Sequence, residues 1–95
     1  MAYGEKKEFV KTIVDCTKAI RLKPGYAGAY YLRGLAFGSQ GKYNNAIPDY
    51  TQAIRLKPDY AGAYHWRGQT YLEIGDKAQG QADLAKAKEL GWKPG

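Results

Sequence analysis

The stretch AIRLKPGYAGAYYLRG at residues 19–34 recurs as AIRLKPDYAGAYHWRG at residues 53–68, with three substitutions. Each copy contains the end of an amphipathic segment, a Lys-Pro pair and the aromatic start of the next segment. Because proline blocks the continuation of a helix, each copy predicts a helix end, a turn and a helix start. No set of reactive side chains is duplicated. The repetition therefore indicates architecture rather than two catalytic sites.

A constant step relates the two copies. Pro24 and Pro58 are 34 residues apart (58 − 24), and the same step relates Gly41 to Gly75. A fixed step of this size is typical of an array of helical repeats. Each unit is expected to contain a first helix, helix A, then a turn, a second helix, helix B, and another turn.

The helix boundaries follow from turn residues and apolar spacing. Glycines at 41 and 75 are expected to end the two A helices, and Pro58 to end the middle B helix. Asp76 is a candidate N-cap, and Gly91 a candidate C-terminal glycine after which Trp92 folds back. The expected helices span residues 5–22, 27–40, 42–56, 61–74 and 76–90.

The positions of the small and aromatic residues resemble the tetratricopeptide repeat. The middle unit matches that pattern at Tyr30, Gly34, Phe37, Tyr43, Ala46, Tyr50, Ala53 and Pro58. The last unit matches at Tyr64, Gly68, Tyr71, Leu84 and Ala87, and departs at Lys77, Gly80 and Trp92. The departures at Lys77 and Gly80 suit a terminal repeat that faces solvent.

The resemblance implies an all-α fold of antiparallel helix pairs stacked as a right-handed α-solenoid with about two and a half units. We expect one domain over residues 1–95. It comprises a partial repeat, mainly helix B, over 1–25, a full repeat over 26–59 and a full terminal repeat over 60–95.

Packing within this array can be predicted from residue size and charge. Gly34 and Ala46 are expected to let helices A and B of one unit approach closely, and Ala53 to receive helix A of the next unit. The repeated polar residues predict two structural ion pairs, Arg33 with Asp49 and Arg67 with Asp83. Asp15 shares the phase of these aspartates but has no arginine of its own. Pro48 lies inside a B helix, where we expect a kink on the outer face.

The net charge of +6 raises the possibility of nucleic-acid binding. The repeated cations, however, precede prolines at helix ends, where they complement the helix dipole, as at Arg21, Lys23, Arg55 and Lys57. A role in RNA binding is therefore a weak alternative. No apolar run approaches the ~20 residues of a membrane span, which argues against a membrane protein. With a single cysteine and no secretory signal, the expected compartment is the cytoplasm.

The sequence gives no indication of catalysis. His65 is the sole histidine, and Cys16 lies on the predicted packing face of the first helix. The glycines lie at helix ends and packing positions rather than in a phosphate-binding loop. We therefore expect no enzyme activity, no cofactor and no metal.

Recognition of another protein is the function that the resemblance implies. In tetratricopeptide arrays the A helices line a concave face that commonly grips a peptide or helical segment of a partner. By phase, the residues expected to bind a partner there are Tyr31, Leu32, Leu35, His65, Trp66 and Gln69, beside Gly28 and Gly62. The alternative for Leu32 and Trp66 is packing between adjacent A helices. Some family members clamp acidic chaperone tails with lysine and asparagine, which are missing from these positions, so peptides anchored by apolar side chains are favoured.

The first helix suggests self-association. By the period, Met1 falls nine positions into a unit, so most of one helix A is missing. Its apolar residues Phe9, Ile13 and Cys16 are then expected to be partly uncovered and to mediate a homo-oligomer. Either the chain is part of a longer array or it assembles through this helix. Structural self-assembly is therefore the main alternative to a peptide-binding function.

Overall fold

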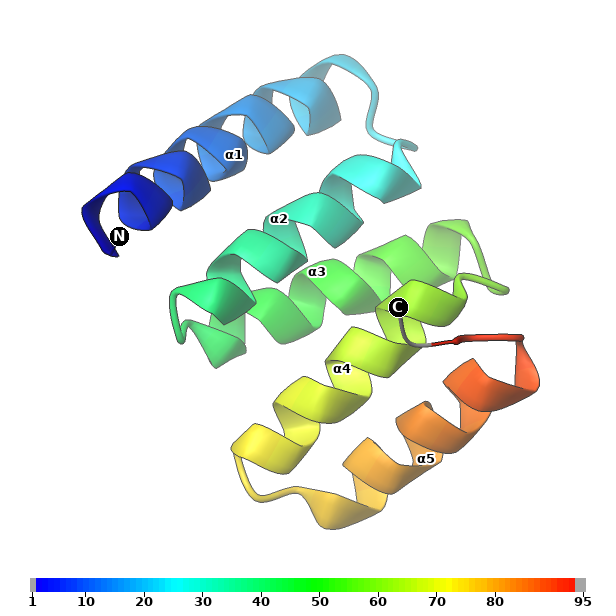
Figure 1. Ribbon diagram of the computed structural model, residues 1–95. Helices are drawn as coiled ribbons and strands as arrows, with labels where there is room; N and C mark the ends of the chain where they lie inside the picture. The colour runs from blue at the N-terminus through cyan, green and yellow to red at the C-terminus, as the bar shows by residue number, and fades with distance from the viewer. Residues whose placement is uncertain (1, 94–95) are drawn as a thin grey trace.

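The computed structural model describes residues 2–93, with side chains from residue 8 onward, and contains helices but no strand in that range. The five helices are α1 (Ala2–Leu22), α2 (Ala27–Ser39), α3 (Tyr43–Leu56), α4 (Ala61–Glu73) and α5 (Lys77–Glu89). They lie side by side in chain order, each antiparallel to the one before it (Figure 1). Helices α2 and α3 form one pair, and α4 and α5 form the next. The predicted all-α solenoid is confirmed.

Each helix-ending glycine adopts a left-handed backbone conformation. The φ angles are +75° at Gly41, +88° at Gly75 and +96° at Gly91. In each case the following amide donates a hydrogen bond of 2.9 Å to a carbonyl in the last turn of the helix. The three donor–acceptor pairs are Lys42 to Phe37, Asp76 to Tyr71 and Trp92 to Ala87. This is the Schellman arrangement, which requires glycine because a Cβ is strained at positive φ.

The first helix is longer than predicted. It runs without interruption from Ala2, whereas the expected helix began at residue 5. The residue equivalent to Gly41 is Lys7 (41 − 34), so this position lacks the glycine that ends the other A helices. The chain therefore continues as one helix into α1.

Close approach within the middle pair depends on Gly34. A Cβ at this position would lie 2.6 Å from Cε1 of Tyr50, so the glycine makes room for the buried ring. Between the pairs, Ala53, Ile54 and Ala63 form a core cluster that is surrounded by tyrosines. Those tyrosines are Tyr30, Tyr31, Tyr60 and Tyr64. The expected roles of Gly34 and Ala53 are confirmed.

Gly80 corrects one expectation about the last pair. The sequence suggested that this residue suits a solvent-facing surface, but it is buried. A Cβ on Gly80 would lie 2.5 Å from Cδ2 of Leu72 and 3.0 Å from the carbonyl oxygen of Gly68. The glycine is therefore a packing residue that accommodates a neighbouring leucine. Lys77, the other departure, is exposed as expected.

The two predicted ion pairs are confirmed. Arg33 donates from Nε and Nη2 to both carboxylate oxygens of Asp49, at 2.8 and 2.7 Å. Its Nη1 also donates to Oγ1 of Thr17, on the B helix of the preceding unit, at 3.2 Å. Arg67 repeats this geometry with Asp83 and Thr51. Each arginine thus joins its own B helix to the previous one.

Two further sequence features lie on the surface. Pro48 is exposed, and α3 continues through it from Tyr43 to Leu56. The outer-face position expected for this proline is confirmed. Asp15, the aspartate without an arginine of its own, is also exposed.

Candidate functional site

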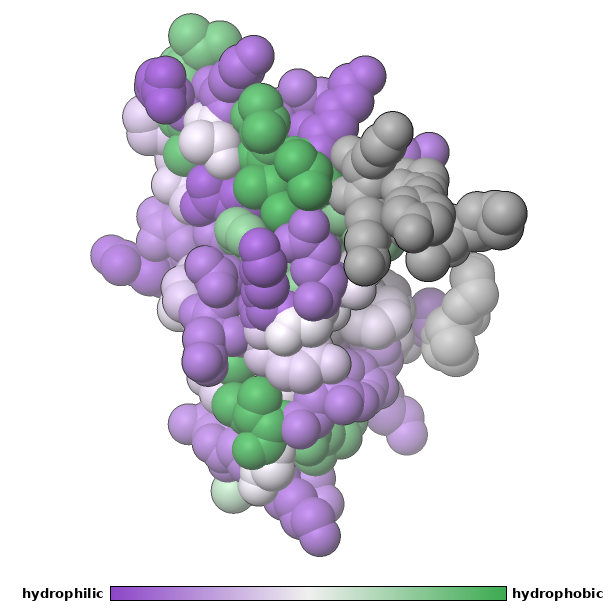
Figure 2. All heavy atoms as spheres, turned by 90° about the vertical axis from the view of Figure 1, so that its left-hand side faces the viewer, coloured by the Kyte–Doolittle hydropathy of each residue, from purple (hydrophilic) through white to green (hydrophobic). Residues whose placement is uncertain are grey.

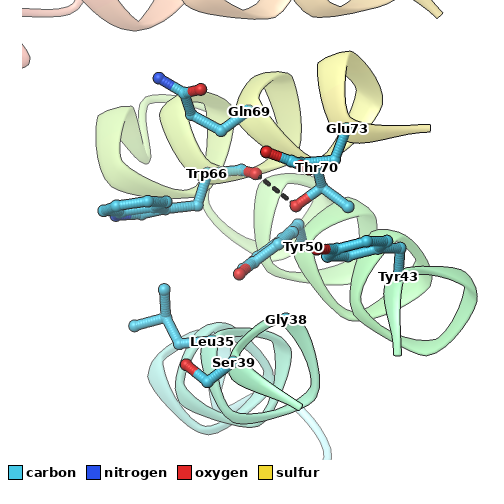
Figure 3. Close-up of a pocket in the computed structure, with 9 residues that line it drawn as sticks. All are labelled: Leu35, Gly38, Ser39, Tyr43, Tyr50, Trp66, Gln69, Thr70 and Glu73. Atoms are coloured by element: carbon cyan, nitrogen blue, oxygen red, sulfur yellow. Dashed lines mark hydrogen bonds between the residues drawn. The ribbon is translucent and has the colours of Figure 1, made fainter. Parts of the chain in front are cut away.

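A pocket of about 470 Å³ lies between the two A helices, α2 and α4, with α3 beneath it (Figure 3). Its walls come from Leu35, Gly38 and Ser39 on α2 and from α4 residues spaced three or four apart. The full lining is Leu35, Gly38, Ser39, Tyr43, Tyr50, Trp66, Gln69, Thr70 and Glu73. Residues three, four and seven positions apart share one face of a helix, which explains why α4 can contribute four of them.

Three of the six residues predicted to bind a partner line this pocket: Leu35, Trp66 and Gln69. The Trp66 residue is 38% exposed, so it offers accessible aromatic surface rather than serving only as packing. Leu35 lies on the facing helix, across the pocket from α4 (Figure 3). Together they provide a largely apolar entrance.

The floor comes from α3, through Tyr43 and Tyr50. Both were assigned to packing by sequence, and nothing in the repeat pattern marks them as binding residues. The missed signal is Gly38, where even a Cβ would lie 3.5 Å from the Tyr50 hydroxyl. Tyr50 is 2% exposed, and because Gly38 has no side chain, the Tyr50 hydroxyl can line the pocket (Figure 3). Burial, followed by the nearby Tyr31 and Asp49, raises the pKa of Tyr50 well above its usual value, so the hydroxyl stays protonated and can donate.

Tyr31 lies outside the pocket, in the seam between the repeat units. Its ring centroid is 4.8 Å from that of Tyr60 and 6.2 Å from that of Tyr50. A Cβ on Gly62 would lie 2.7 Å from its hydroxyl oxygen. Burial, with a smaller effect from Tyr60, raises the pKa of Tyr31. The structure therefore gives this tyrosine a packing role in the seam.

His65 also lies outside the pocket. Its ring stacks on Trp92 at a centroid distance of 4.4 Å and meets Trp66 edge-on at 4.8 Å. Trp92 reaches α4 because the chain turns at Gly91 and runs back toward the start of that helix (Figure 1). The turn predicted at Gly91 is present, whereas the contact of the Trp92 ring with His65 on α4 was not foreseen. Burial lowers the pKa of His65, which favours the neutral ring.

Leu32 is 50% exposed and is not part of the pocket lining. Half of the residue is therefore accessible, more than packing between adjacent A helices alone would leave. It lies on α2 between the pocket and the start of the helix, as an accessible apolar residue.

The three residues expected to mediate self-association differ in their burial. Cys16 is 7% exposed, so the structure removes it from any surface open to a second chain. Phe9 and Ile13 are partly buried, since this face of α1 packs against α2. From residue 8 onward, the large apolar residues of α1 that are exposed are Val10 at 53% and Val14 at 46%, together with Leu22. Figure 2 shows apolar side chains in two separate areas, one at the level of α1 and one near the α4–α5 turn.

Charge is distributed unevenly between the two kinds of helix. Helix α2 contains one formal charge, on Arg33, and α4 contains two, on Arg67 and Glu73. Both arginines are engaged in ion pairs with aspartates. The remaining basic residues of the chain lie on α1, α3, α5 and the turns. The pocket is therefore lined by aromatic and neutral polar groups and by a single carboxylate.

Comparison with known proteins identifies the class. A model described as TPR repeat matches residues 38–75, and one described as tetratricopeptide repeat matches residues 61–90. Together they cover residues 38–90, more than half of the chain. The chain belongs to the tetratricopeptide repeat family, as its sequence pattern suggested.

Solved structures agree with this assignment. A crystal structure of MamA is 34% identical with a TM-score of 0.83; the match covers 87% of this chain and 48% of that chain. The second TPR of Spaghetti (RPAP3), bound to the HSP90 peptide SRMEEVD, is 26% identical with a TM-score of 0.85, covering 94% and 91%. The first TPR of Spaghetti, at 22% identity and a TM-score of 0.88, shares the fold. The chain thus spans about half the length of MamA. The comparison with curated proteins gives no match.

Within residues 2–93, no helix combines the length and the apolar character needed to cross a bilayer. The same part of the chain holds no group of three histidine, cysteine or acidic side chains placed to bind a metal ion. The pocket between α2 and α4 offers aromatic surface, hydrogen-bonding groups and one carboxylate, which equip it for noncovalent binding.

Proposed function

We propose that this chain is a non-catalytic interaction module that binds a peptide segment of a partner protein in the pocket between α2 and α4. The observation that carries the proposal is the opposition of Leu35 and the accessible Trp66 across a hollow floored by Tyr50. Tryptophan and tyrosine bury large areas with little loss of rotamer entropy, which is why they dominate binding hot spots.

The second TPR of Spaghetti supports this use of the fold, because that protein is bound to a peptide. Its peptide, SRMEEVD, contains three acidic residues. The two A helices here contain no lysine, and their arginines are held by aspartates. We therefore propose a segment anchored by apolar side chains rather than an acidic tail. Since the one cysteine is an unpaired thiol, a reducing cytoplasm is the proposed compartment.

The test selects random dodecapeptides displayed on phage against the wild-type protein and measures the selected peptides by calorimetry. Trp66→Ala should weaken their binding by at least about tenfold, as for an aromatic hot spot. Leu56→Ala is the matched control, since Leu56 is also 38% exposed but lies outside the pocket. Equal affinities for wild type and Trp66→Ala would overturn the proposal, as would failure to select any peptide.

Self-association through α1 is the second candidate, and the exposed Val10 and Val14 favour it. Partly buried Phe9 and Ile13 would lie beside such a contact. Sedimentation of the wild type should then show a dimer or larger species that Val14→Asp dissociates. A monomer at high micromolar concentration would eliminate this candidate.

A further inference from the structure

We infer that the pocket between α2 and α4 selects a partner segment in which a bulky apolar side chain is followed or preceded, about three residues away, by lysine or arginine. This inference rests on the proposed function and adds to it the chemical class of the partner.

The positive charge of the chain lies outside the pocket lining. The chain carries a net charge of +6, which by itself suggests an acidic partner. That excess does not reach the pocket, because no lysine or arginine lines it and its one ionisable carboxyl group is that of Glu73. A partner seated here therefore meets local negative charge, in contrast to the charge of the chain as a whole.

The Glu73 carboxylate is available to pair with a cation of a partner. None of the ion pairs within the described part of the chain involves Glu73. The two arginines on the A helices are held by bidentate contacts with Asp49 and Asp83. A cation brought by a partner would thus gain an ion pair without breaking one.

The apolar end of the pocket, at Trp66, is separated from its acidic end, at Glu73. Trp66 and Glu73 are seven residues apart on α4, which corresponds to about 10 Å along the helix axis at 1.5 Å per residue. In a segment with polyproline II conformation, which has three residues per turn and a rise of 3.1 Å per residue, side chains three residues apart lie on the same side, about 9 Å from each other. A segment lying along α4 would place its apolar side chain between Trp66 and Leu35 and a basic side chain, three residues away, at Glu73.

The neutral polar groups fit the same occupant. Tyr50 is 2% exposed, and the part of it that reaches the pocket is its hydroxyl, which points toward the pocket beside Gly38 (Figure 3). Gln69 lies on α4 between Trp66 and Glu73 and can hydrogen-bond a peptide backbone, as the amide carries both donors and an acceptor. These groups hold an extended chain without favouring an acidic side chain.

The experiment uses fluorescein-labelled glycine–serine peptides that carry one phenylalanine, leucine or tryptophan. Lysine, glutamine or glutamate is placed three residues before or after that side chain, and binding is followed by fluorescence anisotropy at low salt. Wild type should bind the lysine peptide about three- to fivefold tighter than the glutamine peptide, as for a partly exposed ion pair. The glutamate peptide should bind most weakly. Glu73→Lys should reverse the order.

Glu89→Lys is the matched control, because it changes the net charge equally at an exposed residue on α5 outside the pocket. It should leave the preference for lysine unchanged. Equal affinity for the three peptides, or the same order in Glu73→Lys as in wild type, would overturn this inference. If those peptides still depend on Trp66, the proposed function stands. If Trp66→Ala does not weaken any of them, the proposed function falls as well.

Discussion

Leu72 occupies the space that a side chain on Gly80 would need: its Cδ2 lies 2.5 Å from the ideal Cβ position. The equivalent positions of the middle unit are Gly38 and Ala46, each 34 residues earlier. In the middle unit the glycine, Gly38, is on the A helix, and the alanine, Ala46, is on the B helix. The last unit exchanges these sizes, with the larger residue on α4 and the glycine on α5.

This exchange predicts energetic coupling between Leu72 and Gly80. Gly80→Ala alone should destabilise the fold, because overpacking costs about 1–3 kcal/mol while the gain in helix propensity is about 1 kcal/mol. In a Leu72→Ala background the closest contact is removed and only the Gly68 carbonyl oxygen at 3.0 Å remains, so the same substitution should destabilise the fold less. Urea denaturation of the four variants measures the coupling energy. Additive effects of the two substitutions would contradict the packing described.

Two glycines of α2 should respond in opposite ways to alanine. Gly34→Ala places a Cβ 2.6 Å from Cε1 of the buried Tyr50 ring, whereas at Gly38 the nearest atom, the Tyr50 hydroxyl oxygen, lies at 3.5 Å. We expect Gly34→Ala to destabilise by about 1–3 kcal/mol. Gly38→Ala should stabilise by up to about 1 kcal/mol, because it improves helix propensity without a clash. Thermal denaturation of the two variants gives their melting temperatures relative to wild type. Equal shifts of the melting temperature would contradict this account.

The same residues show what the sequence could and could not predict. The turn at Gly41 and the pair of Arg33 with Asp49 follow from a fixed spacing, because each copy of the repeat places them in the same local frame. Burial of Gly80 depends instead on a departure from the repeat at Leu72, on another helix. A spacing argument compares equivalent positions and does not detect that compensating change.

The lining of the pocket was predicted in part for a related reason. Helical phase identifies which residues share the inner face of α4, and Trp66 and Gln69, which were expected on that face, line the pocket. It does not reveal which neighbouring side chains fill that face. Tyr31 is taken up by the seam against Gly62, while Tyr50 reaches the pocket from the helix behind.

Cys16 should be protected from thiol reagents in the folded protein. Cys16 is 7% exposed, and its pKa is raised above the usual value mainly because the thiol is buried. Since the thiolate is the reactive form, both effects slow modification. Ellman's reagent at pH 8 should therefore react much more slowly with native protein than with protein in urea. Equally fast reaction in both states would show that α1 does not pack on α2 as described.

His65 should make stability fall in mildly acidic solution. Burial against its neighbours lowers the pKa of the folded ring below the unfolded value of about 6.5. Between the two pKa values the unfolded chain binds more protons, so the free energy of unfolding decreases as the pH falls through this window and levels off below the folded pKa. Urea denaturation at pH 7.5 and 5.5 should show a smaller decrease for His65→Gln than for wild type. Greater wild-type stability at pH 5.5 would mean that the stacked Trp92 favours the charged ring enough to reverse the effect of burial.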